Sequence, residues 1–219
     1  MREGFFGNAS KAKKRAMAAL ELSQDREVEY GAAFALALSG NSSQAQTLAD
    51  DLEKRFPEDT SIRFSYLPTL RARLALNHIG PNHSIGPNHA DSSKALEILQ
   101  VAIPQELGAP RSSVSALFGA LYPIYVRGQA FLAAHQGAEA AAEFEKILAH
   151  RGIVLDDPIG ALARLQLGRA LVLSGNNEKA KTAYQDFLTL WKDADSDIPI
   201  LKQAKAEYAT LQRLPRQRT

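Results

Sequence analysis

The sequence LGRALVLSGNNEKAKTAYQDF, residues 167–187, contains two helix-favouring runs separated by a turn at Gly175. Small or apolar residues follow that glycine at Ala180, Tyr184 and Phe187, which are five, nine and twelve positions later. Steps of four and three place these side chains on one face of an α-helix. The stretch therefore predicts a helical hairpin whose second helix buries one narrow face.

The same spacing occurs three more times in the chain. An alanine at the first buried position matters because a methyl group lets two helix backbones approach closely. Four copies of one spacing predict a repeat architecture of antiparallel helical hairpins, with an all-α fold and essentially no sheet. The other copies are Gly7, Ala12, Ala16, Ala19; Gly40, Ala45, Ala49, Leu52; and Ala90, Ala95, Leu99, Ala102.

The spacing also predicts how the chain is divided. We expect one domain over residues 1–219. In the third hairpin the turn glycine is expected at Gly137, and Pro123 is expected to disturb a helix over about 116–135. No room remains before Gly7 for a pairing helix, so the array is expected to begin half-way through a repeat, as a piece of a larger protein would. The expected units are a half repeat at 1–24, hairpins at about 26–57, 60–103, 114–150 and 158–192, and a capping helix at about 197–214.

Composition excludes several classes of partner and chemistry. Lys and Arg number 26 against 24 Asp and Glu, so the net charge of +2 gives no reason to expect nucleic acid or an acidic membrane surface. The absence of cysteine excludes disulfides and a cysteine nucleophile. No apolar run is long enough for a membrane span or a signal peptide, and a cytoplasmic location is therefore expected.

A family resemblance can be read from the same residues. The positions Leu167, Gly168, Leu171, Gly175, Ala180, Tyr184 and Phe187 resemble the tetratricopeptide repeat, and Gly128, Phe131, Ala140 and Phe144 resemble it a second time. The stretch from about Gly31 to Leu211 is also similar to tetratricopeptide regions that follow the kinase domain in some bacterial serine/threonine kinases. The resemblance implies an α-solenoid that serves as a non-catalytic interaction or scaffolding module of a larger bacterial signalling protein.

The resemblance also implies a concave groove lined by the first helix of each hairpin. A protein or peptide partner, or another domain of the parent chain, would bind there. Tyrosine and arginine suit such anchors because they combine a large rigid surface with polar groups. For Phe34 and Tyr125 a second alternative is expected equally, namely that their side chains fill the hydrophobic core instead of facing the groove. The residues expected to line the groove are Tyr30, Phe34, Tyr66, Arg73, Tyr122, Tyr125, Gln129 and Arg169.

The pentapeptide Ile-Gly-Pro-Asn-His occurs twice in tandem within residues 79–89, where it reads as a duplicated loop inserted between two helices. His78, His83 and His89 are candidate ligands for zinc, nickel or copper, although a loop with this spacing preorganises no site. We expect a surface loop, no cofactor and no metal.

No motif in the sequence supports an enzyme, because a nucleotide-binding loop and the kinase signatures are absent. Two other functions remain open. The groove or the histidine loop can serve ligand or metal sensing, and the half repeat at the start of the chain leaves an apolar helix face that a second copy can cover in a homo-oligomer.

Overall fold

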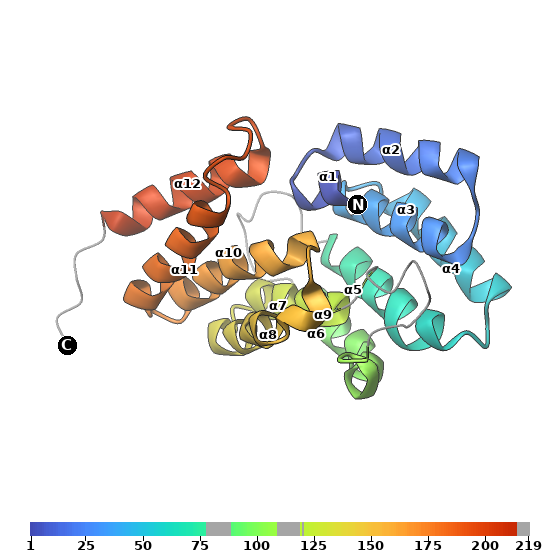
Figure 1. Ribbon diagram of the computed structural model, residues 1–219. Coiled ribbons are helices and arrows are strands. Elements are labelled where there is room, and N and C mark those ends of the chain that lie inside the picture. Colours follow the sequence, from blue (N-terminus) through green and yellow to red (C-terminus); the bar gives the residue numbers. More distant parts are fainter. Residues whose placement is uncertain (78–88, 109–118, 120, 214–219) are drawn as a thin grey trace.

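The computed structural model describes residues 1–77, 89–108, 119 and 121–213 (Figure 1). These residues form helices and turns and contain no β-strand, so the expected all-α class is confirmed for them. The α-helices are α1 (Arg2–Phe5), α2 (Ala9–Leu22), α3 (Arg26–Leu38), α4 (Ser42–Arg55), α5 (Leu67–Asn77), α6 (His89–Ile98), α7 (Tyr122–Ala133), α8 (Gly137–Ala149), α9 (Arg151–Val154), α10 (Pro158–Leu173), α11 (Asn177–Leu190) and α12 (Pro199–Gln212). A π-helical segment, η1 (Ile62–Tyr66), precedes α5, and a 3-10 helix, η2 (Leu99–Gln105), follows α6.

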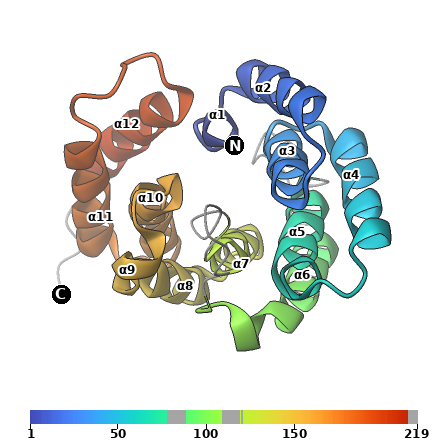
Figure 2. The same ribbon diagram turned by 45° about the vertical axis from the view of Figure 1, so that its right-hand side comes forward.

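The helices follow one another around a nearly closed ring (Figure 2). Helices α3, α5, α7 and α10 lie on the inner side of the ring, and each contacts the next of these four. Helices α4, α8 and α11 lie on the outer side, each packed against its preceding inner helix. The inner side of the ring is therefore built from helices far apart in the sequence.

Four turns between successive described helices contain one residue in the left-handed backbone region. Gly7, Gly40 and Gly175 have φ angles of 84°, 78° and 77° there, where glycine carries no steric penalty. In the third hairpin His135 occupies this position with a φ of 57°. The expectation of a turn at Gly137 is therefore wrong, because Gly137 is the first residue of α8. Counted from His135, Ala140, Phe144 and Ile147 fall at the repeated spacing.

Two glycines let inner and outer helices approach closely. A Cβ atom on Gly128 would lie 2.6 Å from the Phe144 ring, and one on Gly168 would lie 2.8 Å from the Tyr184 ring. Both distances are too short for any side chain to fit without movement. These glycines and rings are the positions by which the sequence predicts the third and fourth hairpins most clearly.

Prolines shift two of the expected helix boundaries. Pro68 cannot donate a backbone hydrogen bond, and the turn directly before it is π-helical, with the N–H of Leu67 bonded to the carbonyl of Ile62. Helix α7 begins at Tyr122 with Pro123 in its first turn, so Pro123 starts this helix rather than disturbing it. The preceding residue, Leu121, is left-handed with a φ of 62°.

The expected end of the second hairpin is also corrected. Helix α6 already includes Ala90, the expected turn residue, and its path continues into η2, which contains Pro104. The expected buried face is nevertheless present, because Ala95, Leu99 and Ala102 are fully buried. The duplicated segment 79–89 lies outside the described residues except for the backbone of its last residue.

Helix α1 fills the place where no helix was expected. It packs against α2 and α3, and Ala12 and Ala16 of α2 are 1% and 5% exposed. The apolar face of α2 is thus covered by the chain itself rather than left open.

Candidate functional site

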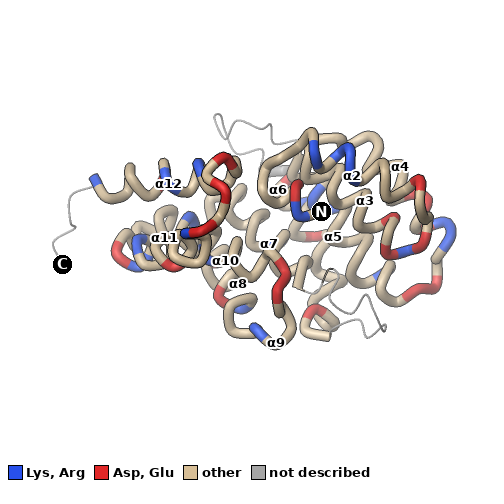
Figure 3. Tube along the Cα trace, turned by 45° about the horizontal axis from the view of Figure 1, so that its top comes forward, with Lys and Arg blue, Asp and Glu red and all other residues tan. Residues whose placement is uncertain are grey.

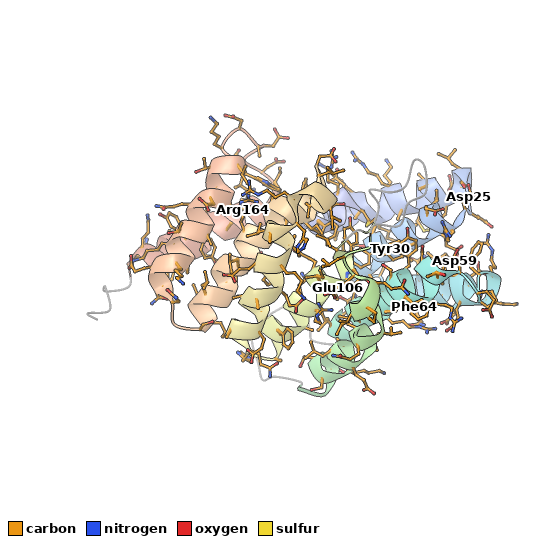
Figure 4. The ribbon with its side chains drawn as sticks, turned by 60° about the horizontal axis from the view of Figure 1, so that its bottom comes forward. Asp25, Tyr30, Asp59, Phe64, Glu106 and Arg164 are labelled. Carbon is orange, nitrogen blue, oxygen red and sulfur yellow. The ribbon has the colours of Figure 1, made fainter. Side chains whose placement is uncertain are left out.

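The aromatic residues expected to line the groove form the interior of the inner layer. The rings of Tyr30 and Tyr66 stack with their centroids 4.0 Å apart, and the rings of Phe34 and Tyr122 lie 5.4 Å apart. None of these four, nor Tyr125, is more than 2% exposed. The expectation that Tyr30, Tyr66 and Tyr122 face an open groove is therefore wrong, whereas Phe34 and Tyr125 follow the stated alternative and fill the core. Tyr30 lies deep between helices in Figure 4.

Phe5 of α1 covers this aromatic cluster. Its ring centroid lies 5.9 Å from that of Phe34, 5.4 Å from Tyr122 and 5.7 Å from Tyr125. The contacts with the two tyrosines are edge-to-face, an arrangement that aromatic rings favour. Phe5 is 7% exposed. A four-residue helix that belongs to none of the hairpins thus occupies the inner side of the ring.

The segment around α1 also joins the two ends of the ring. The backbone N–H of Ile200 donates to the carbonyl of Phe6 at 3.2 Å, and the Phe6 ring packs 4.8 Å from the ring of Trp191. Gly7 lies against Pro199 so closely that a Cβ would come within 3.1 Å of it. The first and last helices therefore meet.

The other three expected groove residues are partly exposed and form part of polar networks. Arg73 of α5 donates to Asn77 at 2.9 Å and to Gln129 of α7 at 3.5 Å. Asn77 in turn donates to the carbonyl of Ala37 at 2.7 Å. The inner helices α3, α5 and α7 are thus linked by one polar chain.

A second network continues from α7 to α12. The side-chain amide of Gln166 donates to the hydroxyl of Tyr125 at 3.2 Å, and Arg169 donates to Gln166 at 3.3 Å. Arg169 also forms a two-armed pair with Glu207, both distances being 2.9 Å. The hydroxyl of Tyr184 donates to Glu207 at 2.8 Å. Because these groups satisfy one another, Arg169 is a bridging residue between helices.

One carboxyl group lies at the edge of the aromatic cluster. Asp157 caps the first turn of α10 by accepting from the N–H of Ile159 at 3.0 Å, and it accepts from the hydroxyl of Tyr122 at 2.9 Å. Burial raises the pKa of Asp157 above its ordinary value, although these two hydrogen bonds act to lower it. Burial, together with the nearby carboxylate, raises the pKa of Tyr122. The pair holds α7 and α10 together.

A buried charged cluster ties η2 to α7 and α8. The guanidinium of Arg127 lies 2.7 Å from Glu106 and 2.6 Å from Glu143. Lys146 completes it, 3.0 Å from Glu106. The Arg127 side chain is only 4% exposed. Burial acts to lower its pKa, but the two carboxylates outweigh burial and raise it. Glu106, which directly follows η2, thus connects this segment to both α7 and α8.

Charge is spread over the molecule in both signs, with neither gathered on one side in Figure 3. A shallow hollow on the outer side, between the end of α4 and η2, is lined mainly by Phe56, Pro57, Phe64 and Val101. Figure 4 shows Phe64 nearer the edge of the molecule than Tyr30. The charged residues at the rim of this hollow include Arg71, which pairs with Glu53 at 2.6 Å.

The candidate metal ligands cannot be placed. His78 and His83 lie outside the described residues, and so does the side chain of His89. Among the residues that the structure describes, no group of three His, Cys, Asp or Glu side chains is arranged to hold a metal ion.

Comparisons with known proteins give no further assignment. No protein-family model matches the sequence, and no curated protein matches it significantly. Within the described part of the chain, none of the helices has the length and apolar character needed to cross a membrane.

Helix α1, which lies on the inner side of the ring, was not predicted from the sequence. The adjacent phenylalanines Phe5 and Phe6, directly before the turn at Gly7, were the available signal. Two large apolar side chains next to each other outside any predicted helix need a place to be buried.

Proposed function

We propose that the chain is a tetratricopeptide-like α-solenoid that binds a segment of a partner protein on the inner side of the ring and performs no chemistry. The repeated turn and the two glycine–aromatic contacts support the repeat family. The proposed role in a larger bacterial signalling protein rests on the family resemblance alone.

One observation carries the proposal. Phe5 sits among rings from α3 and α7 although α1 belongs to no hairpin. The inner side therefore accepts a short segment with an aromatic side chain, which is how helical repeat proteins use a concave surface. A single large aromatic anchor in a dry pocket is also typical of the residues that dominate binding energy.

A peptide selection tests this function. Random peptides displayed on phage are selected against the full chain carrying Phe5→Ala, in which the place of the phenyl ring is empty. We expect the selected peptides to contain a large aromatic residue. They should bind Phe5→Ala more tightly than the wild type, because in the wild type they must displace α1.

Two controls locate the binding. Leu22→Ala removes a side chain that is 89% exposed on α2 and should leave peptide binding unchanged. A synthetic peptide with the sequence of residues 1–8, MREGFFGN, should compete with the selected peptides. Peptides that bind wild type and Phe5→Ala equally and resist this competition would place binding elsewhere.

A further inference from the structure

The inner helices α5, α7 and α10 contain arginine but no lysine, aspartate or glutamate. A guanidinium removed from water needs a counter-ion or a full set of hydrogen bonds. The partners of these arginines therefore show where the fold leaves a positive charge uncompensated. The five residues are Arg71, Arg73, Arg127, Arg164 and Arg169.

Most of them are compensated. Three lie within 2.6 to 2.9 Å of a carboxylate, in the pairs Arg71–Glu53, Arg127–Glu143 and Arg169–Glu207. Arg164 forms no salt bridge: it bonds to the carbonyl of Gly160 at 2.7 Å, and burial and the charge of Arg151 lower its pKa, while the negative charge of Asp186 acts in the opposite direction.

Arg73 differs from the other four. Its hydrogen bonds go to the neutral amides of Asn77 and Gln129, and its Nε atom is covered and has no acceptor. A guanidinium has five N–H donors, so most of them remain unused. Burial lowers the pKa of Arg73, and no carboxylate acts on it to offset this effect.

The residues outside the description supply no acidic side chain. Segments 78–88, 109–118 and 214–219, together with Ala120, contain neither Asp nor Glu. All acidic side chains of the chain are thus among the described residues, and none lies within salt-bridge distance of Arg73. Any counter-ion for the Arg73 guanidinium must therefore be something other than an Asp or Glu side chain of this chain.

We propose that Arg73, with Asn77 and Gln129, is a binding site for one carboxylate group of a ligand that enters the inner side of the ring. All three side chains are partly exposed. The guanidinium presents paired donors that match a carboxylate, and the side-chain amide of Gln129 can donate a further hydrogen bond. Asn77 positions the guanidinium instead, because both N–H groups of its amide already donate, to the carbonyl of Ala37 and the hydroxyl of Ser42. This assignment deepens the proposed function, on which it rests for the source of the ligand.

The charge balance favours a carboxylate over a phosphate. Arg169, the other inner arginine close to Tyr125, is neutralised by Glu207. Of these two arginines only Arg73 has no carboxylate partner, and a phosphate dianion would bring more negative charge than this single guanidinium can neutralise.

Nuclear magnetic resonance of the 15N-labelled full chain tests the site. The Nε–H signal of Arg73 is identified by its loss in Arg73→Lys. On titration with sodium acetate, at constant ionic strength adjusted with sodium chloride, this signal should shift and saturate. The signal of Arg169 should not move.

Glu207→Gln provides the matched control. This change frees Arg169, whose signal should then respond to acetate as Arg73 does in the wild type. An Arg73 signal that stays in place in the wild type overturns the proposal, and so does a larger saturating shift with inorganic phosphate than with acetate.

The source of the carboxylate is separated by a second probe. N-acetyl-glutamate α-amide presents a glutamate side chain between two neutral amide groups. If the Arg73 signal saturates at a lower concentration of this probe than of acetate, the site is assigned to an acidic side chain of a partner protein. If the two probes saturate it at equal concentrations, the site is assigned to a small free acid. If aromatic peptides bind but the Arg73 signal shifts with neither probe, only the carboxylate-site proposal fails and the proposed function stands.

Discussion

The ring of Phe5 meets the ring of Tyr122 edge to face, with the centroids 5.4 Å apart and the planes at 83°. This contact joins a four-residue helix at the start of the chain to a helix more than a hundred residues later. It fills the space at which the first helices of the hairpins converge. Phe5 also contacts Phe34 and Tyr125, and thus helps to bury three of the aromatic residues on the inner side.

Replacing Phe5 by alanine should therefore destabilise the whole fold. Loss of a buried phenyl ring costs about 3 to 5 kcal/mol in the free energy of unfolding. Urea denaturation followed by circular dichroism measures this change. Leu22→Ala is the matched control and should change the free energy by less than about 0.5 kcal/mol, because Leu22 is 89% exposed. Equal effects of the two substitutions would mean that α1 is not docked in solution.

The helices of the fold could be predicted where a buried face repeats. Ala45, Ala49 and Leu52 are fully buried in α4, as are Ala180 and Phe187 in α11, and the spacing alone identifies these faces. These residues are buried by contacts between helices that are neighbours in the sequence, so a local sequence pattern is enough to predict them.

The residues that cover the inner helices could not be predicted in the same way. Helical periodicity places Tyr30 and Tyr125 on the inner side, but it does not show whether solvent, a partner or the chain itself covers them. For Tyr125 the answer depends on Phe5, whose four-residue helix is too short to have a periodic signal. Arg73 was among the residues expected to line the groove and is partly exposed, whereas the pairing of Arg169 with Glu207 depends on the position of α12 and was not predicted.

The close contact between Gly168 and Tyr184 yields a second prediction. Gly168→Ala would place a methyl carbon 2.8 Å from the tyrosine ring, forcing α10 and α11 apart. We expect a loss of about 1 to 3 kcal/mol in the free energy of unfolding. Gly152→Ala is the control, because a Cβ there meets nothing within 4 Å. That substitution should be neutral or slightly stabilising, and a loss at Gly152 as large as at Gly168 would contradict the packing explanation.

The left-handed turn at His135 yields a third prediction. A residue with a side chain is strained at a φ of 57°, and glycine is not. His135→Gly should raise the free energy of unfolding by about 0.5 to 1 kcal/mol. The reverse change, Gly175→Ala, should lower it by about 1 kcal/mol, since Gly175 has a φ of 77°. Thermal unfolding of both variants checks the prediction, and a destabilised His135→Gly would show that the imidazole makes a needed contact.

The last prediction concerns pH. Glu29 of α3 is 2% exposed and lies 2.7 Å from Arg55. Burial, with a further contribution from the neighbouring carboxyl group of Asp51, raises the pKa of Glu29 to about 7, although Arg55 acts to lower it. In the unfolded chain the group titrates near its ordinary value of 4.5. Between these two values the folded protein holds a proton that the unfolded chain has released.

Stability must then fall as pH rises from about 4.5 to 7. The Glu29→Gln variant lacks this titration. As pH rises through the interval, the free energy of unfolding of the variant minus that of the wild type should therefore increase by up to about 3 kcal/mol. Asp51→Asn removes the neighbouring carboxylate and should reduce the pH dependence without abolishing it. Urea denaturation at pH 5, 6, 7 and 8 measures all three proteins. Parallel curves for wild type and Glu29→Gln would show that Arg55 keeps Glu29 ionised throughout, so that burial does not set its pKa.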